Sequence, residues 1–311
     1  MSRRPTRGAP GRTRERGLKA SEPTSTGPLA GQAPRVYAVG VTVIPRTAHI
    51  AASLVALASA VPAPAHDTWL QAPRLPIASG STVLFELTSG GAFPSLDRAV
   101  ESGRIAREGI RLGGMTRRFK VRSGGKEALR LQAPLAVEGV AVAFVSLRPK
   151  ALELKAAQVE KYLAEIGEQE RLGREWERGP RKWREVYRKH AKTFLRVGQA
   201  SGSPGAWSDP VGLDLEIVPE RDPTLLQPGD ALSVLVLRSG QPMAGFTLAA
   251  TDGRERRFQR TDTEGRATLR LDRPGRWLLA GTYLRRASRP DAEWESDFTT
   301  LTLQVGAMDG P

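Results

Sequence analysis

Short segments in which apolar and polar residues alternate fill the chain from Val211 to Val305, and turn residues separate them. Every second side chain of a β-strand lies on the same face, so this alternation predicts strands with one buried face. Pro-Gly and Asp-x-x-Gly turns at short intervals favour antiparallel neighbours. We therefore predict a mainly β protein in which residues 211–306 form an immunoglobulin-like or prealbumin-like antiparallel sandwich domain.

Two further regions precede this sandwich. Residues 66–149 contain β-rich segments at 82–88 and 137–147, and they predict an N-terminal β domain. Residues 150–198 change character: Leu152–Ile166 carries apolar side chains at helical spacing, and the charged stretch from Trp183 to Phe194 is interpreted as a second helix. We therefore predict a helical insertion between the two β regions.

The first 65 residues have the composition of a leader. Residues 1–36 are rich in Arg, Pro, Gly, Ser and Thr, so we expect them to be disordered; a translation start assigned too far upstream would explain them. Residues 37–65 contain Arg46, a 12-residue apolar run and Ala63-Pro64-Ala65, as a signal peptide does. Cleavage after Ala65 predicts a periplasmic or secreted protein that begins at His66. The run is too short to cross a bilayer, and no transmembrane segment is predicted in the mature chain.

The net charge of the 311-residue chain is +14, and half of the excess lies in the leader. Residues 1–65 hold nine Lys or Arg and two Glu, so residues 66–311 hold 38 basic and 31 acidic residues. An excess of this size, taken as spread over the mature chain, is typical of an arginine-rich surface, and no nucleic-acid partner is expected. The chain has no Cys, which excludes disulfides, thiolate metal sites and a lipid-anchored Cys.

No motif of a hydrolase or a nucleotide-dependent enzyme occurs in the sequence. The only histidines are His49 in the leader, His66 and His190, and the latter two lack the surroundings of a nucleophile. We therefore predict a protein without catalytic activity. The Asp262-Thr-Glu-Gly265 turn resembles half of a calcium loop, but hairpin turns use the same residues, so it is interpreted as structural.

His66 is the first candidate metal ligand. Cleavage after Ala65 would place its α-amino group beside its imidazole, and these two nitrogens can chelate Cu(II) or Ni(II). Two ligands are too few, and Asp67 with a distant carboxylate, or His190 if the fold brings it close, could add more. A second group of polar residues, Asp291–Ser296, could also ligate a cation. The predicted ligands of Ni, Co or Cu are His66, Asp67, Glu293 and Glu295. His66 as a polar residue at the start of a strand, and the carboxylates as a solvated loop, are the alternatives.

Several stretches are informative when taken together in their order along the chain: His66–Leu70, Tyr187–Lys192 with Val197-Gly198, Val211–Pro219, Pro228–Asp230 with Gly240–Pro242, Thr261–Arg266, Gly275–Trp277 and Glu293–Ser296. In this order they resemble a bacterial family of unknown function linked to nickel and cobalt uptake, the NikM-like periplasmic proteins. The resemblance covers about residues 66–305. It implies an exported, β-rich protein that assists metal uptake, with His66 as a metal contact. His190 stands where relatives are expected to carry a Tyr or another non-ligand.

The leading interpretation is a periplasmic protein without enzymatic activity that binds nickel or cobalt and delivers it to a membrane transporter or an outer-membrane receptor. The alternative is a binding or adhesion module that recognises a protein or glycan through its sandwich loops without a metal. A third reading is a copper oxidase with a histidine brace. That site needs a second imidazole, and His190 is the only candidate.

Overall fold

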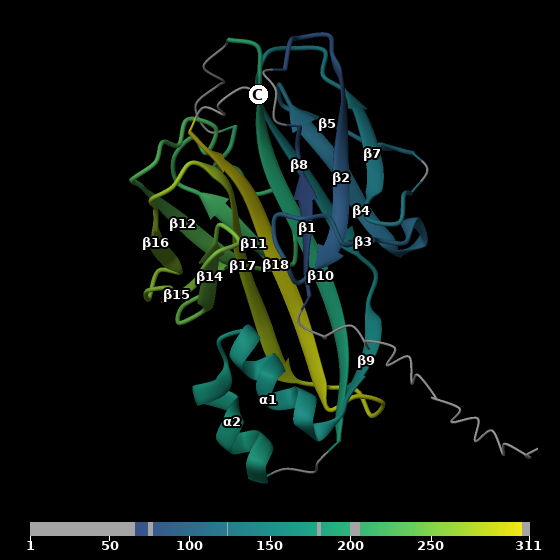
Figure 1. Cartoon of the computed structure of the whole chain (residues 1–311), viewed down its shortest axis with the longest axis vertical. Helices are drawn as coiled ribbons and strands as arrows, with labels where there is room; N and C mark the ends of the chain where they lie inside the picture. The colour runs from purple at the N-terminus through teal and green to yellow at the C-terminus, as the bar shows by residue number, and fades with distance from the viewer. Residues whose placement is uncertain (1–65, 74–76, 123, 179–181, 200–205, 307–311) are drawn as a thin grey trace, which may run out of the picture. The chain divides into compact units, whose positions relative to one another are not determined.

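The computed structural model describes residues 66–73, 77–122, 124–178, 182–199 and 206–306, all within one compact unit, Ser59–Pro311. The predicted leader 1–36, the signal peptide 37–65 and the cleavage after Ala65 concern residues outside this part of the chain. In the described part, strands form three sheets, and the two α-helices follow one another directly (Figure 1).

The N-terminal sheet has the order β1-β2-β7-β6, and all its pairs are antiparallel. The short strand β3 pairs with the end of β2, at Thr88 and Ser89, beyond the residues of β2 that pair with β7. The strands of this sheet are β1 (Asp67–Gln71), β2 (Thr82–Gly90), β3 (Arg98–Ala99), β6 (Lys120–Val121) and β7 (Leu129–Pro134).

The central sheet has nine strands in the order β15-β14-β17-β18-β10-β8-β4-β5, with β9 paired to β10. Its strands are β4 (Ile105–Leu112), β5 (Met115–Arg117), β8 (Gly139–Leu147), β9 (Lys150–Leu154), β10 (Trp183–Val197), β14 (Thr247–Thr251), β15 (Arg256–Arg260), β17 (Gly275–Arg286) and β18 (Trp294–Val305). The pair β10–β18 is parallel, and the other pairs are antiparallel. Strands from the predicted segments 66–149, 150–198 and 211–306 all meet in this sheet. The division into these domains stays a prediction.

The C-terminal sheet is smaller and antiparallel, with β12 paired to its three neighbours. Its strands are β11 (Leu215–Pro219), β12 (Asp230–Arg238), β13 (Gln241–Pro242) and β16 (Arg266–Leu271). The Asp262–Gly265 turn leads into β16. The Asp262 Oδ1 accepts hydrogen bonds from the amides of Glu264 and Arg266, and Gly265 has a positive φ of 79° where a Cβ would meet the Met243 amide. The turn therefore has a structural role.

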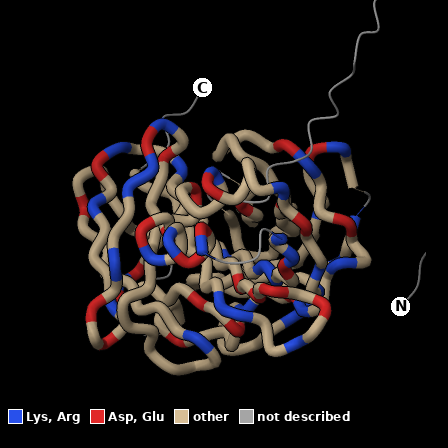
Figure 2. Tube along the Cα trace, turned by 90° about the horizontal axis from the view of Figure 1, so that it is seen from below, with Lys and Arg blue, Asp and Glu red and all other residues tan. Residues whose placement is uncertain are grey.

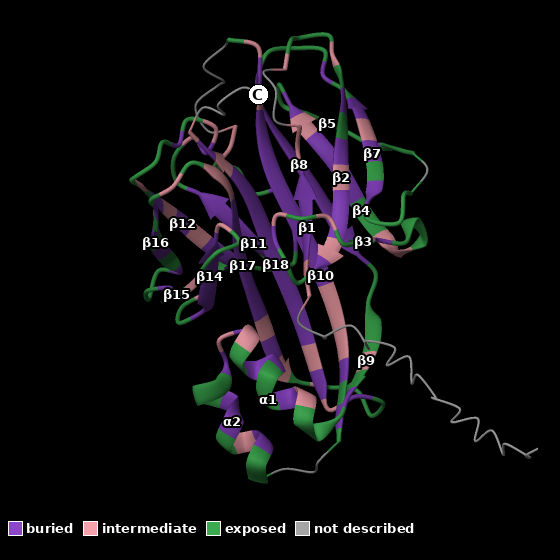
Figure 3. Ribbon diagram, viewed as in Figure 1, coloured by how far each residue is buried: buried purple, intermediate pink, exposed green. Residues whose placement is uncertain are grey.

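The two outer sheets cover opposite faces of the central sheet. In β8, Val140, Val142 and Phe144 join the core under the C-terminal sheet, whereas the alternate residues Ala141 and Val145 join the core under the N-terminal sheet. All nine residues of β8 are buried for this reason, and Figure 3 shows that β18 is also buried along most of its length. The predicted fold class, a mainly β antiparallel sandwich, is confirmed, with the central sheet shared by two sandwiches.

The predicted helical insertion is half correct. Helix α1 (Ala156–Glu165) lies within the predicted segment 152–166, and it is followed by α2 (Gln169–Arg178). The second predicted helix was wrong, because Trp183–Phe194 belongs to strand β10. This strand has hydrogen-bonded neighbours on both sides, and those pairings hold a charged segment in an extended form. Neither α-helix in the described residues has the length and apolarity needed to cross a bilayer.

Candidate functional site

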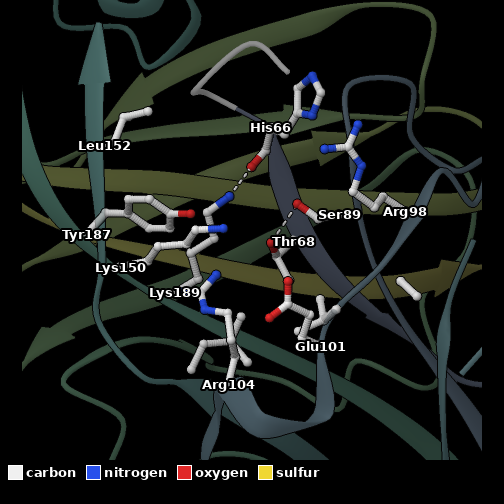
Figure 4. A pocket seen from close by; sticks show the side chains of 13 residues that line it. His66, Thr68, Ser89, Arg98, Glu101, Arg104, Lys150, Leu152, Tyr187 and Lys189 are labelled. Atoms are coloured by element: carbon white, nitrogen blue, oxygen red, sulfur yellow. Dashed lines mark hydrogen bonds between the residues drawn. The ribbon is translucent and has the colours of Figure 1, made fainter. Parts of the chain in front are cut away.

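A pocket lies where the chain enters β1. Its walls come from β2, β3, the short 3-10 helix η1 (Ser102–Arg104), β9 and β10, so residues far apart in the sequence meet there (Figure 4). Its empty space is about 730 Å³, including the open mouth. The ionisable side chains that line it are His66, Arg98, Glu101, Arg104, Lys150 and Lys189, together with the phenol of Tyr187. Four permanent or near-permanent cations therefore face a single carboxylate.

Lys189 is the buried cation of this pocket, with 6% of its surface exposed. Its ammonium group donates a hydrogen bond to the backbone carbonyl of His66 and lies 5.4 Å from the ring centre of Tyr187 and 5.2 Å from that of Phe298. Burial lowers the pKa of Lys189 to about 8; the nearby Asp67 opposes this shift and Arg104 adds to it. The amine is still mainly charged at neutral pH.

The other three cations stand around the mouth. Arg104 donates to the carbonyl of Arg148 at 2.8 Å and its guanidinium lies 5.3 Å from the Tyr187 ring centre. Arg98 and Lys150 are exposed, and neither side chain has a hydrogen bond or ion pair with any described residue. Figure 4 shows Lys150 and Lys189 across the pocket from Arg98. A ligand between the two walls would meet charged donors from both sides.

His66 contributes its ring to the rim. Burial and the nearby Lys189 lower the pKa of the imidazole, so the ring is neutral at pH 7. The ring lies over Gly91, where an added Cβ would be 3.6 Å from Cδ2 and Nε2. The described residues form no hydrogen bond with the ring nitrogens, which are therefore open to a ligand.

The four predicted metal ligands do not converge. Asp67 forms an ion pair with Arg256 at 2.7 Å and lines a different hollow from His66. Glu293 pairs with Arg184 at 2.6 Å and Glu295 pairs with Arg285 at 3.0 Å. Among the described residues, no three His, Asp or Glu side chains come close enough together to hold a metal ion.

His190 does not join His66 either. It follows Lys189 in β10, and successive strand residues point to opposite faces, so Lys189 faces β1 and His190 faces the C-terminal sheet. His190 is 1% exposed, and within the described structure neither ring nitrogen has a hydrogen-bond partner. Burial lowers its pKa. The two imidazoles required by a histidine brace are therefore separated by the central sheet.

Two buried carboxylates were missed by the sequence interpretation. Glu216 pairs with Lys192 at 2.8 Å, with both side chains almost fully buried, and accepts hydrogen bonds from the amides of Val211, Gly212 and Leu213. Glu185 accepts hydrogen bonds from the Tyr162 hydroxyl, the Trp183 indole and the Ser296 hydroxyl. Both networks connect layers of the fold. Neither carboxylate lines the basic pocket, although Glu185 is close enough to Lys189 to act on its charge.

The fold and the site together define a class: an antiparallel β-sandwich protein with a basic pocket beside its first strand. The profile of a family described as "Domain of unknown function (DUF4198)" matches residues 63–284, so the chain belongs to this family. The family description assigns no activity, and it does not connect the chain to nickel or cobalt.

No curated protein matches the chain. Solved structures similar to it include the D0-D1 domain of Intimin, with 10% identity over 76% of this chain and 97% of that chain and a TM-score of 0.18. The fibronectin(III)-like modules of Clostridium thermocellum CbhA match with 9% identity, 78% and 97% coverage and a TM-score of 0.18. The mouse nectin-like molecule 4 ectodomain matches with 12% identity, 78% and 66% coverage and a TM-score of 0.19. At these TM-scores the similarities carry no argument about this chain.

Proposed function

We propose that this protein is a binding protein without catalytic activity that holds a small anionic ligand in the pocket beside His66. The observation that carries the proposal is the charge of the pocket lining, which contains four cations, Arg98, Arg104, Lys150 and Lys189, and one carboxylate, Glu101. Like charges gathered at one concave site repel each other, and an anion there relieves that repulsion while gaining charge-assisted hydrogen bonds.

The lining also indicates the kind of anion. Guanidinium groups bind carboxylate or phosphate oxygens through paired donors, and two of them lie at this mouth. Tyr187 and Leu152 add apolar surface beside these donors. A compact ligand with several carboxylate or phosphate oxygens fits these features.

Isothermal titration with citrate and with inorganic phosphate tests this proposal. We expect the double variant Arg98→Ala/Lys150→Ala to bind the better of the two anions about 10- to 100-fold more weakly, because two charge-assisted contacts are removed. The matched control is Arg174→Ala/Arg270→Ala, which removes two exposed and unpaired cations outside the pocket. Equal affinity in the pocket variant and the control would refute the proposal.

Export and uptake belong to the same proposal. The signal-peptide pattern and the NikM-like resemblance support a periplasmic protein that passes its ligand to a membrane transporter or an outer-membrane receptor. A direct test is fractionation of cells that express the full chain, followed by the intact mass of the released protein. A mature chain that still carries Arg46 would contradict cleavage after Ala65.

Transition-metal binding at His66 is a second candidate function. One observation favours it: the imidazole is neutral at pH 7 and has no partner among the described residues. The surrounding cations oppose a bare metal ion, so affinity would depend on the freed α-amino group and on a ligand-borne anion. Titration of processed protein with Ni(II), Co(II) and Cu(II) decides it, and affinity no tighter than about 100 μM, roughly 5 kcal/mol, would exclude it.

A further inference from the structure

The positive charge of the mature chain is concentrated in one short segment. Residues 111–130 hold seven Lys or Arg and one acid, Glu127, whereas the rest of residues 66–311 holds 31 basic and 30 acidic residues. The interpretation of an evenly spread excess was therefore wrong. Along much of the rest of the trace, basic and acidic residues are interspersed, as Figure 2 shows.

This segment forms one side of the sandwich. Strand β5 is the edge of the central sheet, β6 is the edge of the N-terminal sheet, and only Arg118 and Phe119 separate them. The chain thus passes from one sheet to the other along this side, and every residue of the two strands is exposed. We call this side, residues 111–122 and 124–130 with Leu84 and Val137, the basic edge.

Four cations of the basic edge have no interaction partner among the described residues: Arg117, Lys120, Lys126 and Arg130. The other three have partners. Arg111 donates to backbone carbonyls at 206–210, Arg118 pairs with Glu108, and Arg122 donates to the Gln132 side chain. Arg117 on β5 and Lys120 on β6 can each protect an edge strand from pairing with another chain. Lys126 and Arg130 lie outside these two strands, so edge protection does not account for them.

Apolar side chains are exposed at the same place. Met115 is 56% exposed, Val121 44%, Val137 42% and Leu84 41%, and the described residues hold only two other exposed large hydrophobic side chains. Met115 and Val137 line a common hollow, together with Arg117 and apolar residues of the two sheets. Leu84 and Lys120 both align with Gln132 across β7, which places an apolar and a basic side chain in the same row.

We propose that the basic edge docks on an anionic lipid surface. Cations beside lipid phosphates and apolar side chains at the level of the head groups are the two features that hold a protein at such a surface. A nucleic acid would use the cations but offers no apolar layer for Met115 and Val137. The proposal does not depend on the ligand of the pocket, which has its own residues.

A site-specific fluorescent probe tests the proposal in the full-length protein. Because the chain has no Cys, Met115→Cys gives a single labelling position on the basic edge, and Arg270→Cys gives a matched exposed position on β16. Vesicles of phosphatidylglycerol with phosphatidylcholine should shift the emission of the probe at position 115 to the blue and leave the probe at 270 unchanged. Vesicles of phosphatidylcholine alone should shift neither probe.

Charge variants complete the test in the Met115→Cys protein. Lys120→Gln/Arg130→Gln should require about 25-fold more anionic lipid for the same shift, since each cation near such a surface contributes about fivefold. The control Arg174→Gln/Lys182→Gln, with the same change in net charge, should leave the titration unchanged. The proposal is overturned if position 115 gives no shift, if position 270 shifts equally, if the control weakens binding as much, or if an acidic polypeptide or an oligonucleotide binds the basic edge and the vesicles do not.

Discussion

Lys189 lies beneath β1. A charged amine in this buried position destabilises the fold, whereas a neutral amine would attract an anion only weakly. The pKa of Lys189, about 8 compared with 10.5 for an exposed lysine, measures this destabilisation. The unfolded chain binds more protons than the folded chain between these two values, so this group favours folding above pH 10.5. That contribution is lost as the pH falls through 8. Near pH 7 the lysine therefore weakens the fold while it charges the pocket.

The variant Lys189→Met separates the two effects. We expect its free energy of unfolding at pH 7 to rise by about 1 to 3 kcal/mol, because the buried charge is removed and the aliphatic length is kept. Its affinity for the anion should fall, and the wild-type affinity should fall as the pH rises above 8. Urea denaturation and titration between pH 6.5 and 9.5 measure both. A variant that is less stable and binds normally would contradict this account.

The side chain of His190 lies on the opposite face of β10 from Lys189, and it affects how stability depends on pH in the acidic range. Burial lowers the pKa of its imidazole below 6.5, and the neighbouring Asp297 only partly opposes the shift. The unfolded chain therefore binds the proton more readily, and the stability that the neutral ring contributes is present above pH 6.5 and lost as the pH falls below it.

His190→Leu should flatten this pH dependence. We expect the urea midpoint of the wild-type protein to fall from pH 7.5 to pH 5, and the midpoint of the variant to fall less over the same range. Leu has a similar apolar volume and has no ring nitrogens that lack partners in the buried site. If both proteins lose the same stability, the protons are bound elsewhere.

For individual residues, the sequence could identify candidates for the site but not the residues that lie beside them in space. His66 was singled out, and it does line the pocket. Arg98, Arg104, Lys150 and Lys189 were missed because they come from β3, η1, β9 and β10, and only the sheet pairings bring them together. A local pattern such as Asp291–Ser296 was noticed instead, although its carboxylates are engaged in ion pairs with arginines.

Strand β10 shows why some strands were predicted correctly from the sequence and another was mistaken for a helix. The strands with clean alternation, such as β16, were found, because their exposed and buried residues differ in polarity. Along β10 from Glu185 to Thr193, both faces carry charged or polar residues that the flanking layers bury. Most buried partners of Glu185, Lys189 and Lys192 lie outside β10. The local sequence therefore shows only a charged segment, which was interpreted as a helix.

Glu185 connects helix α1 to the beginning of strand β10 through hydrogen bonds. Its carboxylate accepts hydrogen bonds from Tyr162 on α1, Ser296 on β18 and Trp183, whose ring stacks on Trp294 at 4.7 Å. Burial raises the pKa of Glu185, and the three hydrogen bonds offset only part of the shift. Its contribution to stability is therefore complete below pH 4.5 and lost as the pH rises through the folded-state pKa.

Two substitutions at Glu185 should differ sharply. Glu185→Gln keeps an acceptor for the Trp183 indole and can donate to the two hydroxyls, so we expect stability at pH 8 equal to or above that of the wild type. Glu185→Leu leaves three buried donors without an acceptor and should cost about 2 to 4 kcal/mol. Tryptophan fluorescence during urea unfolding measures both, with the exposed Glu153→Gln as control. Equal losses in the Gln and Leu variants would show that the hydrogen bonds do not hold the helices.

At the scale of the whole described unit, the central sheet makes the two sandwiches interdependent. Strand β8 contributes to both cores, and the buried pair Lys192–Glu216 joins the central sheet to the C-terminal sheet. Burial alone would raise the pKa of Glu216, but Lys192 and the backbone amides bring it below its usual value. The sequence predicted the sandwich class correctly. It could not predict that one sheet is shared, because the pairing joins strands that are far apart in the sequence, and local patterns contain no information about it.

Because of this sharing, we expect the protein to unfold in a single calorimetric transition, with the calorimetric and van't Hoff enthalpies equal. Glu216→Gln should lower the stability of the whole transition by about 3 to 5 kcal/mol, since it leaves Lys192 charged and unpaired in the interior. The control Glu220→Gln, which breaks a surface pair with Arg266, should cost less than about 1 kcal/mol. Two separate transitions, with only one shifted by Glu216→Gln, would contradict this expectation.

The position of β18 has a consequence for the order in which the chain can assemble. This strand is the last in the described part of the sequence, yet it lies between β17 and β10 in the middle of the largest sheet, and the Thr300 hydroxyl donates to the Thr68 carbonyl of the first strand. A ribosome or translocation pore delivers a chain from its amino end. The middle of this sheet therefore cannot close until residue 305 has emerged, and until then the chain before it remains incompletely folded.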